Sequence, residues 1–214
     1  MRVLTEWDSR RMLVKYGFDV PKAYLARSEA EAVKFANKIG YPIVMKIMSK
    51  DIIHKSDAGC VFLNLLNEAS VVAAYHRIME NALNYKKEAE IEGVIIEEMV
   101  HGVELLVGSK FDEVFGKVVS FGIGGYLAEL IKDISIRVVP VSMNDAMEMI
   151  EDIEHKKLLE GFRNLPEVNK KTLAKTIVRV SKLVRKKNIV EMDINPLFAT
   201  SNRCVVGDAR IVLE

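Results

Sequence analysis

One stretch of the sequence combines a cation in an apolar run with a polar loop that carries a histidine. Residues 43–48 read Ile-Val-Met-Lys-Ile-Met, with Lys46 as the one charged residue of the run. This run is typical of a buried strand, where a lysine is costly unless it meets an anion. Residues 49–59 are polar and include His54, and residues 61–65 return to an apolar pattern. The stretch predicts a phosphate site with a nucleophile nearby; a hairpin with an ordinary polar loop is the alternative.

A second set of chemical groups lies near the end of the chain. Asp193 and Asn195 fall in the strand-like run 191–197, and Asp208 falls in the run 204–210. Carboxylate and amide oxygens suit Mg²⁺, which needs only one or two protein ligands when phosphates supply the others. These residues predict a magnesium site, although an Asn-Pro pair also favours a turn that binds nothing.

Carboxylates also close a predicted strand in the middle of the chain. The run 94–99 ends in Glu97, Glu98 and Met99, and Glu104 follows soon after. Strand-end carboxylates and the backbone next to them can hold an adenine amine and ribose hydroxyls. An edge strand with its charges in solvent is the alternative explanation.

Arg137 is a second cation in an apolar, strand-like run, residues 134–140. Like Lys46, it is expensive in such a run unless it is paired. Two such cations and a carboxylate–amide metal site together favour a site for the phosphates of ATP. His54 adds a potential nucleophile, because an imidazole nitrogen can accept a phosphoryl group. A lone histidine in a loop, by contrast, is more often exposed and inert.

Helices and strands alternate early in the chain, and strands then follow one another. This order favours an α+β chain with two lobes over a doubly wound parallel sheet. One helix is expected to begin at Ser70, with His76 as a core or boundary residue on its apolar stripe. The glycines at 122–125 lack the spacing of a dinucleotide fingerprint, and no helix long enough for a crossover is expected after them. Capping and periodicity predict helices over 5–16, 28–39, from 70, from 142 and across 173–184, and strands over 43–48, 61–65, 94–99, 103–108, 117–121, 134–140, 191–197 and 204–210.

Composition limits the class of protein. The chain has 214 residues, 50% of them hydrophobic and 29% charged, which is typical of a globular protein with a sizeable core. A formal net charge of +1 gives no electrostatic argument for nucleic acid or an anionic membrane. The two cysteines, Cys60 and Cys204, have no metal-ligand spacing and favour a reducing compartment. No run has the length of a membrane helix, and the start of the chain has no signal-peptide pattern, so the cytoplasm is expected.

Beyond these patterns, the sequence resembles the ATP-grasp domain of ADP-forming acyl-CoA synthetases, specifically their separate β subunit. The resemblance covers residues 4–211, which is nearly the whole chain. It depends above all on a His-Lys-Ser-Asp loop and an Asp-Ile-Asn-Pro-Leu strand, since a generic ATP-grasp ligase shares the lysine and the metal strand but lacks the histidine loop. One departure is Gly59-Cys60, where the family usually has two glycines. The motifs that carry the resemblance are Gly40–Lys46, Ile53–Asp57, Gly102–Leu105, Phe121–Gly125 and Asp193–Leu197.

The resemblance implies a fold and an activity. The fold would be an ATP-grasp fold of two lobes with the nucleotide between them, the first lobe at about 18–98 and the second at about 99–214, with the helix of residues 1–17 packed against the second. The family reversibly makes ATP from ADP and phosphate while it releases CoA from an acyl-CoA. A larger α subunit binds CoA and the acyl group, and its phosphohistidine hands the phosphoryl group to the β subunit. A hetero-oligomer would follow, with no nucleic acid or membrane partner.

The resemblance also implies a role for each candidate residue. Lys46 would hold the nucleotide phosphates, and Mg²⁺ would bind to Asn195 and Asp208. His54 would be a second phosphoryl carrier, moved by its loop, and Asp193 would orient or stabilise its charged form. The resemblance also places Glu97 and Met99 at the adenine and Glu104 at the ribose of ATP or ADP. Two further phosphate contacts are expected from the residues themselves: Arg137, as a cation in an apolar run, and Lys55, beside His54.

Two other functions remain open from the sequence. One is a free-standing ATP-grasp ligase that activates a carboxylate as an acyl phosphate; it leaves His54 without a role and needs room for a further substrate lobe. The other is a non-catalytic, nucleotide-binding subunit of a larger assembly. Co-purification with a CoA-binding partner would separate a β subunit from both.

Overall fold

The structure, a computed structural model, describes the backbone of residues 1–214 and every side chain except those of Leu127 and Glu129. The chain divides into two compact units. The inserted unit comprises residues 21–99, and the larger unit comprises residues 1–20 and 100–214. Each unit has its own sheet and its own hydrophobic core, so each is described by itself.

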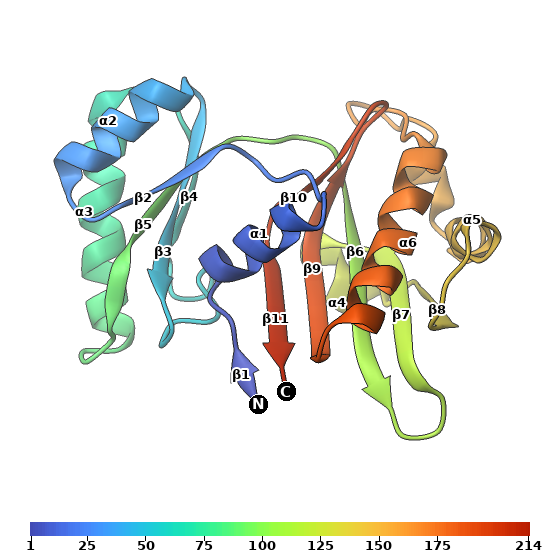
Figure 1. Cartoon of the computed structure of the whole chain (residues 1–214). Helices are drawn as coiled ribbons and strands as arrows, with labels where there is room; N and C mark the ends of the chain where they lie inside the picture. The colour runs from blue at the N-terminus through green and yellow to red at the C-terminus, as the bar shows by residue number, and fades with distance from the viewer. The chain divides into compact units, whose positions relative to one another are not determined.

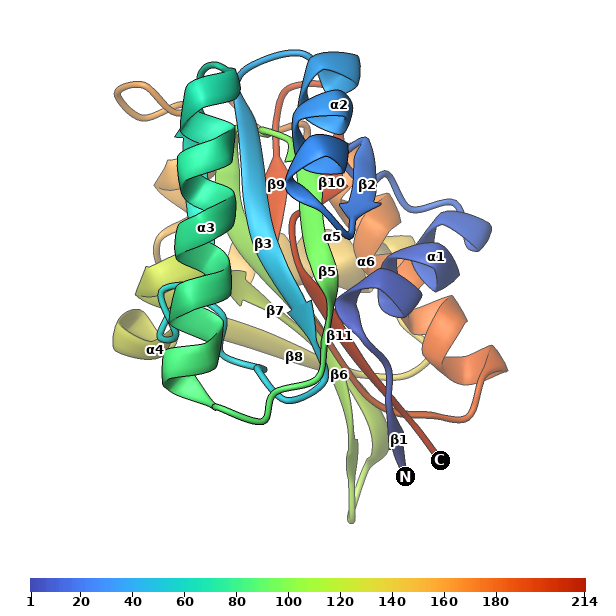
Figure 2. The same ribbon diagram turned by 90° about the vertical axis from the view of Figure 1, so that its left-hand side faces the viewer.

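The inserted unit is a four-stranded antiparallel sheet with two helices on one face. Its strands lie in the order β2-β5-β3-β4. Figure 2 shows α2 and α3 side by side against this sheet. Their core partners on the sheet are Ile43, Met45 and Ile47, which alternate along β3. The elements are β2 (Ala23–Ala26), α2 (Glu29–Ile39), β3 (Ile43–Ser49), β4 (Val61–Leu65), α3 (Glu68–Tyr85) and β5 (Ile91–Glu98).

The two helices of the inserted unit begin at side-chain caps. The Ser28 hydroxyl accepts a hydrogen bond from the backbone N–H of Glu31, as the sequence predicts for α2. Helix α3 begins earlier than predicted, because Asn67 rather than Ser70 is its N-cap. The sequence pattern predicts Val72, His76, Met79 and Leu83 as the apolar stripe of α3. This stripe is wrong by one position, because the buried residues are Val71, Ala74, Ile78 and Ala82. His76 is consequently exposed and pairs with Glu29 of α2 at 2.7 Å, so it is not a core or boundary residue.

The larger unit is built on a seven-stranded antiparallel sheet. Six strands follow the order β1-β11-β9-β6-β7-β8, and β10 pairs with β9. Figure 1 shows α6 and α5 packed beside each other on this sheet and the long β6–β7 hairpin extending past it. The elements are β1 (Arg2–Val3), α1 (Glu6–Lys15), β6 (Val103–Asp112), β7 (Gly116–Ile123), the 3₁₀ helix η1 (Gly125–Leu127), α4 (Ala128–Ile131), β8 (Ile134–Val138), α5 (Met143–Asp152), η2 (Lys156–Leu159), α6 (Lys170–Lys186), β9 (Ile189–Ala199), β10 (Cys204–Val206) and β11 (Ala209–Leu213).

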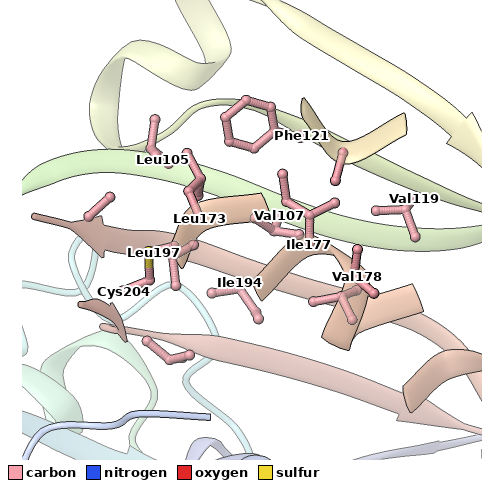
Figure 3. Packing of buried hydrophobic residues seen from close by; sticks show 14 of the residues in the cluster. Leu105, Val107, Val119, Phe121, Leu173, Ile177, Val178, Ile194, Leu197 and Cys204 are labelled. Carbon is pink, nitrogen blue, oxygen red and sulfur yellow. The ribbon is translucent and has the colours of Figure 1, made fainter. Parts of the chain in front are cut away.

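The core of the larger unit lies between α6 and one face of its sheet. Figure 3 shows Leu173, Ile177 and Val178 of α6 among strand residues that include Phe121 and Ile194. Phe121 and Ile194 are both fully buried. Because side chains alternate across a strand, the residues between these core positions lie on the opposite face. We call that opposite face the open face; it carries Gly108, Ser120 and Asp193, which are cross-strand neighbours.

Two α+β units with antiparallel sheets confirm the predicted fold class. The prediction that no long helix follows the glycines at 122–125 is also confirmed, since η1 and α4 together span only residues 125–131. The predicted final strand over 204–210 is wrong in extent, because Gly207 and Asp208 separate β10 from β11. Among the described residues, no helix is long and apolar enough to cross a membrane.

The core of the larger unit gives a stability prediction. Phe121 has no exposed surface, whereas Phe115 on the β6–β7 turn is 65% exposed. We expect Phe121→Ala to lower the free energy of unfolding by about 3–5 kcal/mol, because it removes buried apolar surface and leaves a cavity. Phe115→Ala is the matched control, with an expected change within about 0.5 kcal/mol. Urea unfolding of both variants measures the difference, and equal effects would contradict this assignment of the core.

Candidate functional site

Lys46 and Glu97 form a buried ion pair in the inserted unit. The Lys46 Nζ lies 2.6 Å from Glu97 Oε1, and the two side chains are 12% and 4% exposed. Val44 lies opposite Glu97 in the pairing of β3 with β5, so Lys46 and Glu97 are diagonal neighbours on one face. That face is opposite the one that packs on α2 and α3, because Met45 and Ile47 beside Lys46 belong to the helix-facing core. The anion that Lys46 needs is therefore supplied within the same sheet.

Met99 and Glu98 follow Glu97 at the end of β5. The Met99 side chain is partly buried. The Glu98 backbone N–H donates to the Lys22 carbonyl at 2.9 Å, which holds the end of β5 against the segment before β2. Glu97 thus has a partner in Lys46, and its proposed contact with adenine stays a prediction, as does that of Met99.

His54 lies in the loop that joins β3 to β4. The His54 side chain is exposed, and Lys55 beside it is partly buried. The loop backbone bonds to itself, since the N–H of Ala58 donates to the His54 carbonyl at 3.1 Å and that of Cys60 to the Lys55 carbonyl at 2.8 Å. The imidazole is thus accessible, on a loop whose backbone is fixed by its own hydrogen bonds. Asp193, its proposed partner, belongs to the other unit.

Asp193, Asn195 and Asp208 gather where β9 meets the start of β11. The N–H of Asn195 donates to the Asp208 carbonyl at 3.2 Å, and Arg210 lies opposite Asp193 in the strand pairing. The Asp208 Oδ1 accepts from the N–H of Ala209 at 2.7 Å. The structure therefore brings together three residues that the sequence places on two separate predicted strands.

Burial and like charge raise the pKa of Asp193. Loss of water around its carboxyl is the larger cause, and the negative charges of Asp208 and Glu191 add to it, while Arg210 opposes it. A divalent cation at this point would offset the repulsion between the two carboxylates. Their oxygens and the Asn195 amide are hard ligands of the kind that Mg²⁺ prefers. This small donor set fits Mg²⁺ when phosphate supplies the other ligands.

A glycine turn adjoins this cluster. The N–H of Gly125 donates to Asn195 Oδ1 at 2.8 Å, and the N–H of Gly124 donates to the Glu104 carbonyl at 2.9 Å. Gly125 has a left-handed φ of +65°, and a Cβ at this position would overlap Glu104 Oε2. The left-handed φ therefore favours glycine at this position. Loss of water raises the pKa of the Glu104 carboxyl, although the side chain as a whole is exposed.

Arg137 is not brought together with this cluster. It lies opposite Val119, a core residue, so its side chain is on the helix-covered face of the sheet, whereas Asp193 is on the open face. The Arg137 guanidinium pairs with Asp152 at 2.7 Å and with Glu148 at 3.8 Å, both on α5. These carboxylates satisfy the cation that the sequence pattern had marked as a candidate phosphate ligand.

Two features of the site were not expected from the sequence. The glycines at 124 and 125 belong to a motif of the family resemblance, but no contact of theirs with Asn195 or Glu104 was expected; Gly125 contacts both. The signal was the presence of two adjacent glycines directly after a strand, which marks a tight turn. An open groove beside Asp193 was also unexpected; its lining comes from β6, β7 and β9 and includes Gly108, Lys110, Ser120, Glu191 and Asp193.

Comparison with known proteins assigns the family. A family model described as "ATP-grasp domain" matches residues 1–213. The β subunit of acetate–CoA ligase I (ADP-forming) from Pyrococcus furiosus is 46% identical over 214 residues, which cover 99% of this chain and 92% of that subunit. The chain belongs to the ATP-grasp family of ADP-forming acetate–CoA ligase β subunits.

Solved structures agree with this family. Dinucleotide-forming acetyl-coenzyme A synthetase 1 from Ca. Korarchaeum cryptofilum, in complex with coenzyme A, Ca-AMPCP and HgCl⁺, is 40% identical with a TM-score of 0.95, over 100% of this chain and 94% of that chain. A second structure of that protein is in complex with coenzyme A and Mg-AMPPCP, with its phosphohistidine segment pointing towards the nucleotide-binding site. It is 38% identical, with a TM-score of 0.84, over 99% of this chain and 93% of that chain.

Membership of this ATP-grasp family confirms the predicted family, fold and enzyme class. It favours the enzyme subunit over both the free-standing carboxylate ligase and the non-catalytic module. The roles of individual side chains are not decided by family membership, because identity over a whole chain says nothing of one residue's task. Those roles rest on the geometry described above.

The Lys46–Glu97 pair gives a prediction about coupling. We expect Glu97→Ala to destabilise the protein by about 3 kcal/mol or more, because it leaves a buried cation without this carboxylate. In a double-mutant cycle with Lys46→Met, measured by urea unfolding, the coupling energy should be about 1–3 kcal/mol. Lys170 and Glu151 are the matched control: they are also 2.6 Å apart but 28% and 49% exposed. Their coupling should stay below about 1 kcal/mol, and equal coupling in both cycles would contradict the buried pair.

Proposed function

We propose that this chain is the nucleotide-binding β subunit of a reversible ADP-forming acyl-CoA ligase. It binds Mg-ATP or Mg-ADP and passes a phosphoryl group between a phosphohistidine and ADP, so that acyl-CoA cleavage is coupled to ATP synthesis. The observation that carries the proposal is the cluster of Asp193, Asn195 and Asp208 beside the Gly125 turn, which gathers oxygen ligands for a metal–phosphate complex. The solved relative that binds Mg-AMPPCP supports this function.

The proposed nucleotide contacts come from residues of each unit. In the inserted unit, Lys46 donates to phosphate oxygens, a charge-assisted bond that is stronger than a neutral one. Glu97 holds the Lys46 ammonium in place at 2.6 Å, which limits the side-chain entropy that Lys46 loses when it binds phosphate. Glu97 and the backbone near Met99 flank the adenine. In the larger unit, the Glu104 carboxylate accepts hydrogen bonds from ribose hydroxyls.

Asn195 and Asp208 would hold Mg²⁺. When bound there, the ion neutralises phosphate charge during phosphoryl transfer. The Gly125 N–H fixes the orientation of the Asn195 amide, because it points Oδ1 toward the turn and leaves a second lone pair on that oxygen for a ligand. Asp193, whose carboxylate interacts with that of Asp208, adds negative charge near the two ligands. Arg137 has no part in this proposal, since it pairs with α5 on the other face.

His54 carries the phosphoryl group between the partner and the nucleotide. A ring nitrogen of His54 attacks the phosphorus of the partner's phosphohistidine; a new N–P bond forms as the donor's N–P bond breaks, and the donor imidazole is released. In the second step an oxygen of the ADP β-phosphate attacks, an O–P bond forms and the His54 N–P bond breaks. Lys55 and Lys46 offset the negative charge of the transferred group, and the same steps run in reverse from ATP.

The donor phosphohistidine requires a partner. We propose a larger, CoA-binding α subunit that holds the acyl group and carries the phosphohistidine, and so a hetero-oligomer. The name of the Pyrococcus furiosus relative, a β subunit, supports a complex of unlike chains. The phosphohistidine segment of the Korarchaeum relative supports delivery of the phosphoryl group by a segment outside the nucleotide-binding domain.

The metal assignment is tested with Asp208→Ala in the assembled complex. We expect the Mg²⁺ concentration for half-maximal ATP formation to rise by at least about 10–100-fold, because a charged oxygen ligand is lost. Circular dichroism should show an intact fold. Glu80→Ala, which removes an exposed carboxylate of α3, is the control and should leave the Mg²⁺ requirement unchanged. A folded Asp208→Ala complex with a normal Mg²⁺ requirement would remove Asp208 from the metal site.

The histidine relay is tested with His54→Ala in the same complex. We expect nucleotide binding by calorimetry to be retained and ATP formation from acyl-CoA, ADP and phosphate to be lost. The partner should still form its own phosphoenzyme, which intact-protein mass spectrometry detects. His76→Ala removes another exposed histidine of the inserted unit and should keep full activity. ATP formation at the wild-type rate in the His54→Ala complex would disprove the relay.

A further inference from the structure

The loop that carries His54 is fixed where it leaves β3. The Asp51 carboxylate bonds to Lys86 Nζ at 2.5 Å and accepts from the Glu90 N–H at 2.8 Å. The hydrogen bond with Lys86 is the larger cause, and together with the one from Glu90 it holds the pKa of the Asp51 carboxyl below its usual range. The Asp51 N–H in turn donates to the Ser49 hydroxyl at 3.1 Å. The start of the loop is thus tied to the segment that follows α3, and Ile52 next to Asp51 is fully buried.

The loop is fixed again where it enters β4. The Asn81 Nδ2 of α3 donates to the Gly59 carbonyl at 2.7 Å. Gly59 has a φ of +63°, and a Cβ there would lie 3.0 Å from the same Asn81 nitrogen. Cys60 beside it is fully buried, with its Sγ 3.3 Å from the Ala58 carbonyl oxygen. A glycine thus lets α3 approach the loop closely enough for Asn81 to hold it.

Between the two fixed ends, the exposed part of the loop is short. The fully buried Ile52 precedes it and the buried Ala58 follows it. Ile53 and His54 are exposed, and the carbonyls of His54 and Lys55 accept hydrogen bonds from later residues of the same loop. The backbone that carries the imidazole is therefore held at both ends and wound on itself in the middle.

We propose that Asp51 and Asn81 are positioning residues for His54. They clamp both ends of the loop to α3 and its following segment, so that the imidazole stays at one place and the donor phosphohistidine comes to it. This proposal rests on the proposed role of His54 as a phosphoryl carrier. It replaces the expectation that movement of the His54 loop carries the group. In-line attack on phosphorus needs a fixed geometry, and a misplacement of about 1 Å can cost about 100-fold in rate.

The contacts of Asp51 and Asn81 restrict the loop, and they contribute little to the free energy of global unfolding. The Asp51 and Lys86 side chains are 29% and 48% exposed, and ion pairs of this exposure have little effect on global unfolding. Their effect is on the loop, because a segment held at both ends has fewer conformations to sample. A positioning role thus predicts changes in loop exchange and in rate without a change in the unfolding midpoint.

The test uses Asp51→Ala, Asp51→Asn and Asn81→Ala in the assembled complex. We expect amide hydrogen exchange over residues 53–60 to become at least about ten-fold faster in Asp51→Ala and Asn81→Ala. ATP formation should fall by about 10–100-fold, while the Kd for Mg-ADP and the urea midpoint stay at wild-type values. Asp51→Asn keeps one acceptor oxygen and loses the charge, so it should show a smaller effect of the same kind. Lys50→Ala, on the same loop and 66% exposed, is the control and should behave as the wild type.

The outcomes separate this proposal from the relay itself. Wild-type exchange and wild-type rates in Asp51→Ala and Asn81→Ala, with His54→Ala inactive, would overturn the clamp and leave the relay standing. Faster exchange with an unchanged rate would overturn the positioning role, because the loop would then work without being fixed. An active His54→Ala complex would overturn the relay, and with it any positioning role of the clamp. A lower urea midpoint that matches the loss of rate would assign Asp51 and Asn81 to general stability and overturn the proposal.

Discussion

The alternation of side chains along antiparallel strands is the constraint on which the rest of this structure depends. In the larger unit, Met192 and Ile194 of β9 belong to the core, so Asp193 between them must lie on the open face. In the inserted unit, Met45 and Ile47 of β3 pack toward the helices, so Lys46 must lie on the other face. Each sheet therefore has one face that packs in its core and an opposite face that carries candidate site residues.

Charge is distributed differently on these two faces, the one that carries Lys46 and the one that carries Asp193. In the inserted unit, Lys46 and Glu97 form a pair of opposite sign in which both side chains are largely buried. In the larger unit, Asp193 and Asp208 have the same sign, and the pKa of Asp193 is raised as a result of burial and of this repulsion. A pair of opposite sign holds a lysine in place for an anion, whereas a pair of equal sign favours the arrival of a cation. Phosphate and Mg²⁺, the ligands of the proposed function, would match these two arrangements.

The second feature common to both units is a glycine whose backbone lies close to a polar side chain of another element. Gly125 fits against Glu104 and donates to Asn195, and Gly59 lets Asn81 reach the histidine loop. In both places a glycine with positive φ lies close to a polar side chain of a neighbouring element. Loops that carry function are thereby fixed to regular elements, which is how mobile segments acquire defined geometry. Cys60, next to Gly59, is fully buried and so anchors the end of the loop.

The sequence by itself determined most of the secondary structure and the chemical types at the site. The sequence predicted the apolar run around Lys46, the helix caps at Ser28 and Ser142, and the Asp-Ile-Asn-Pro-Leu strand. These features can be predicted because periodicity and capping are local properties. Element boundaries that depend on packing were predicted less well. The N-cap of α3 is Asn67 and not Ser70, and Gly207 and Asp208 divide the predicted last strand.

Only the tertiary structure decided which charged groups meet. Lys46 and Arg137 look alike in sequence, as single cations in apolar strands, yet Lys46 pairs with Glu97 across one sheet and Arg137 pairs with Asp152 on the helix-covered face of the other. Likewise, Asp51 and Asn81 carry no local signal of their link to the histidine loop. The physical reason is that strand register and helix docking join residues distant in sequence, and a local pattern fixes the alternation of side chains without fixing which face meets which neighbour.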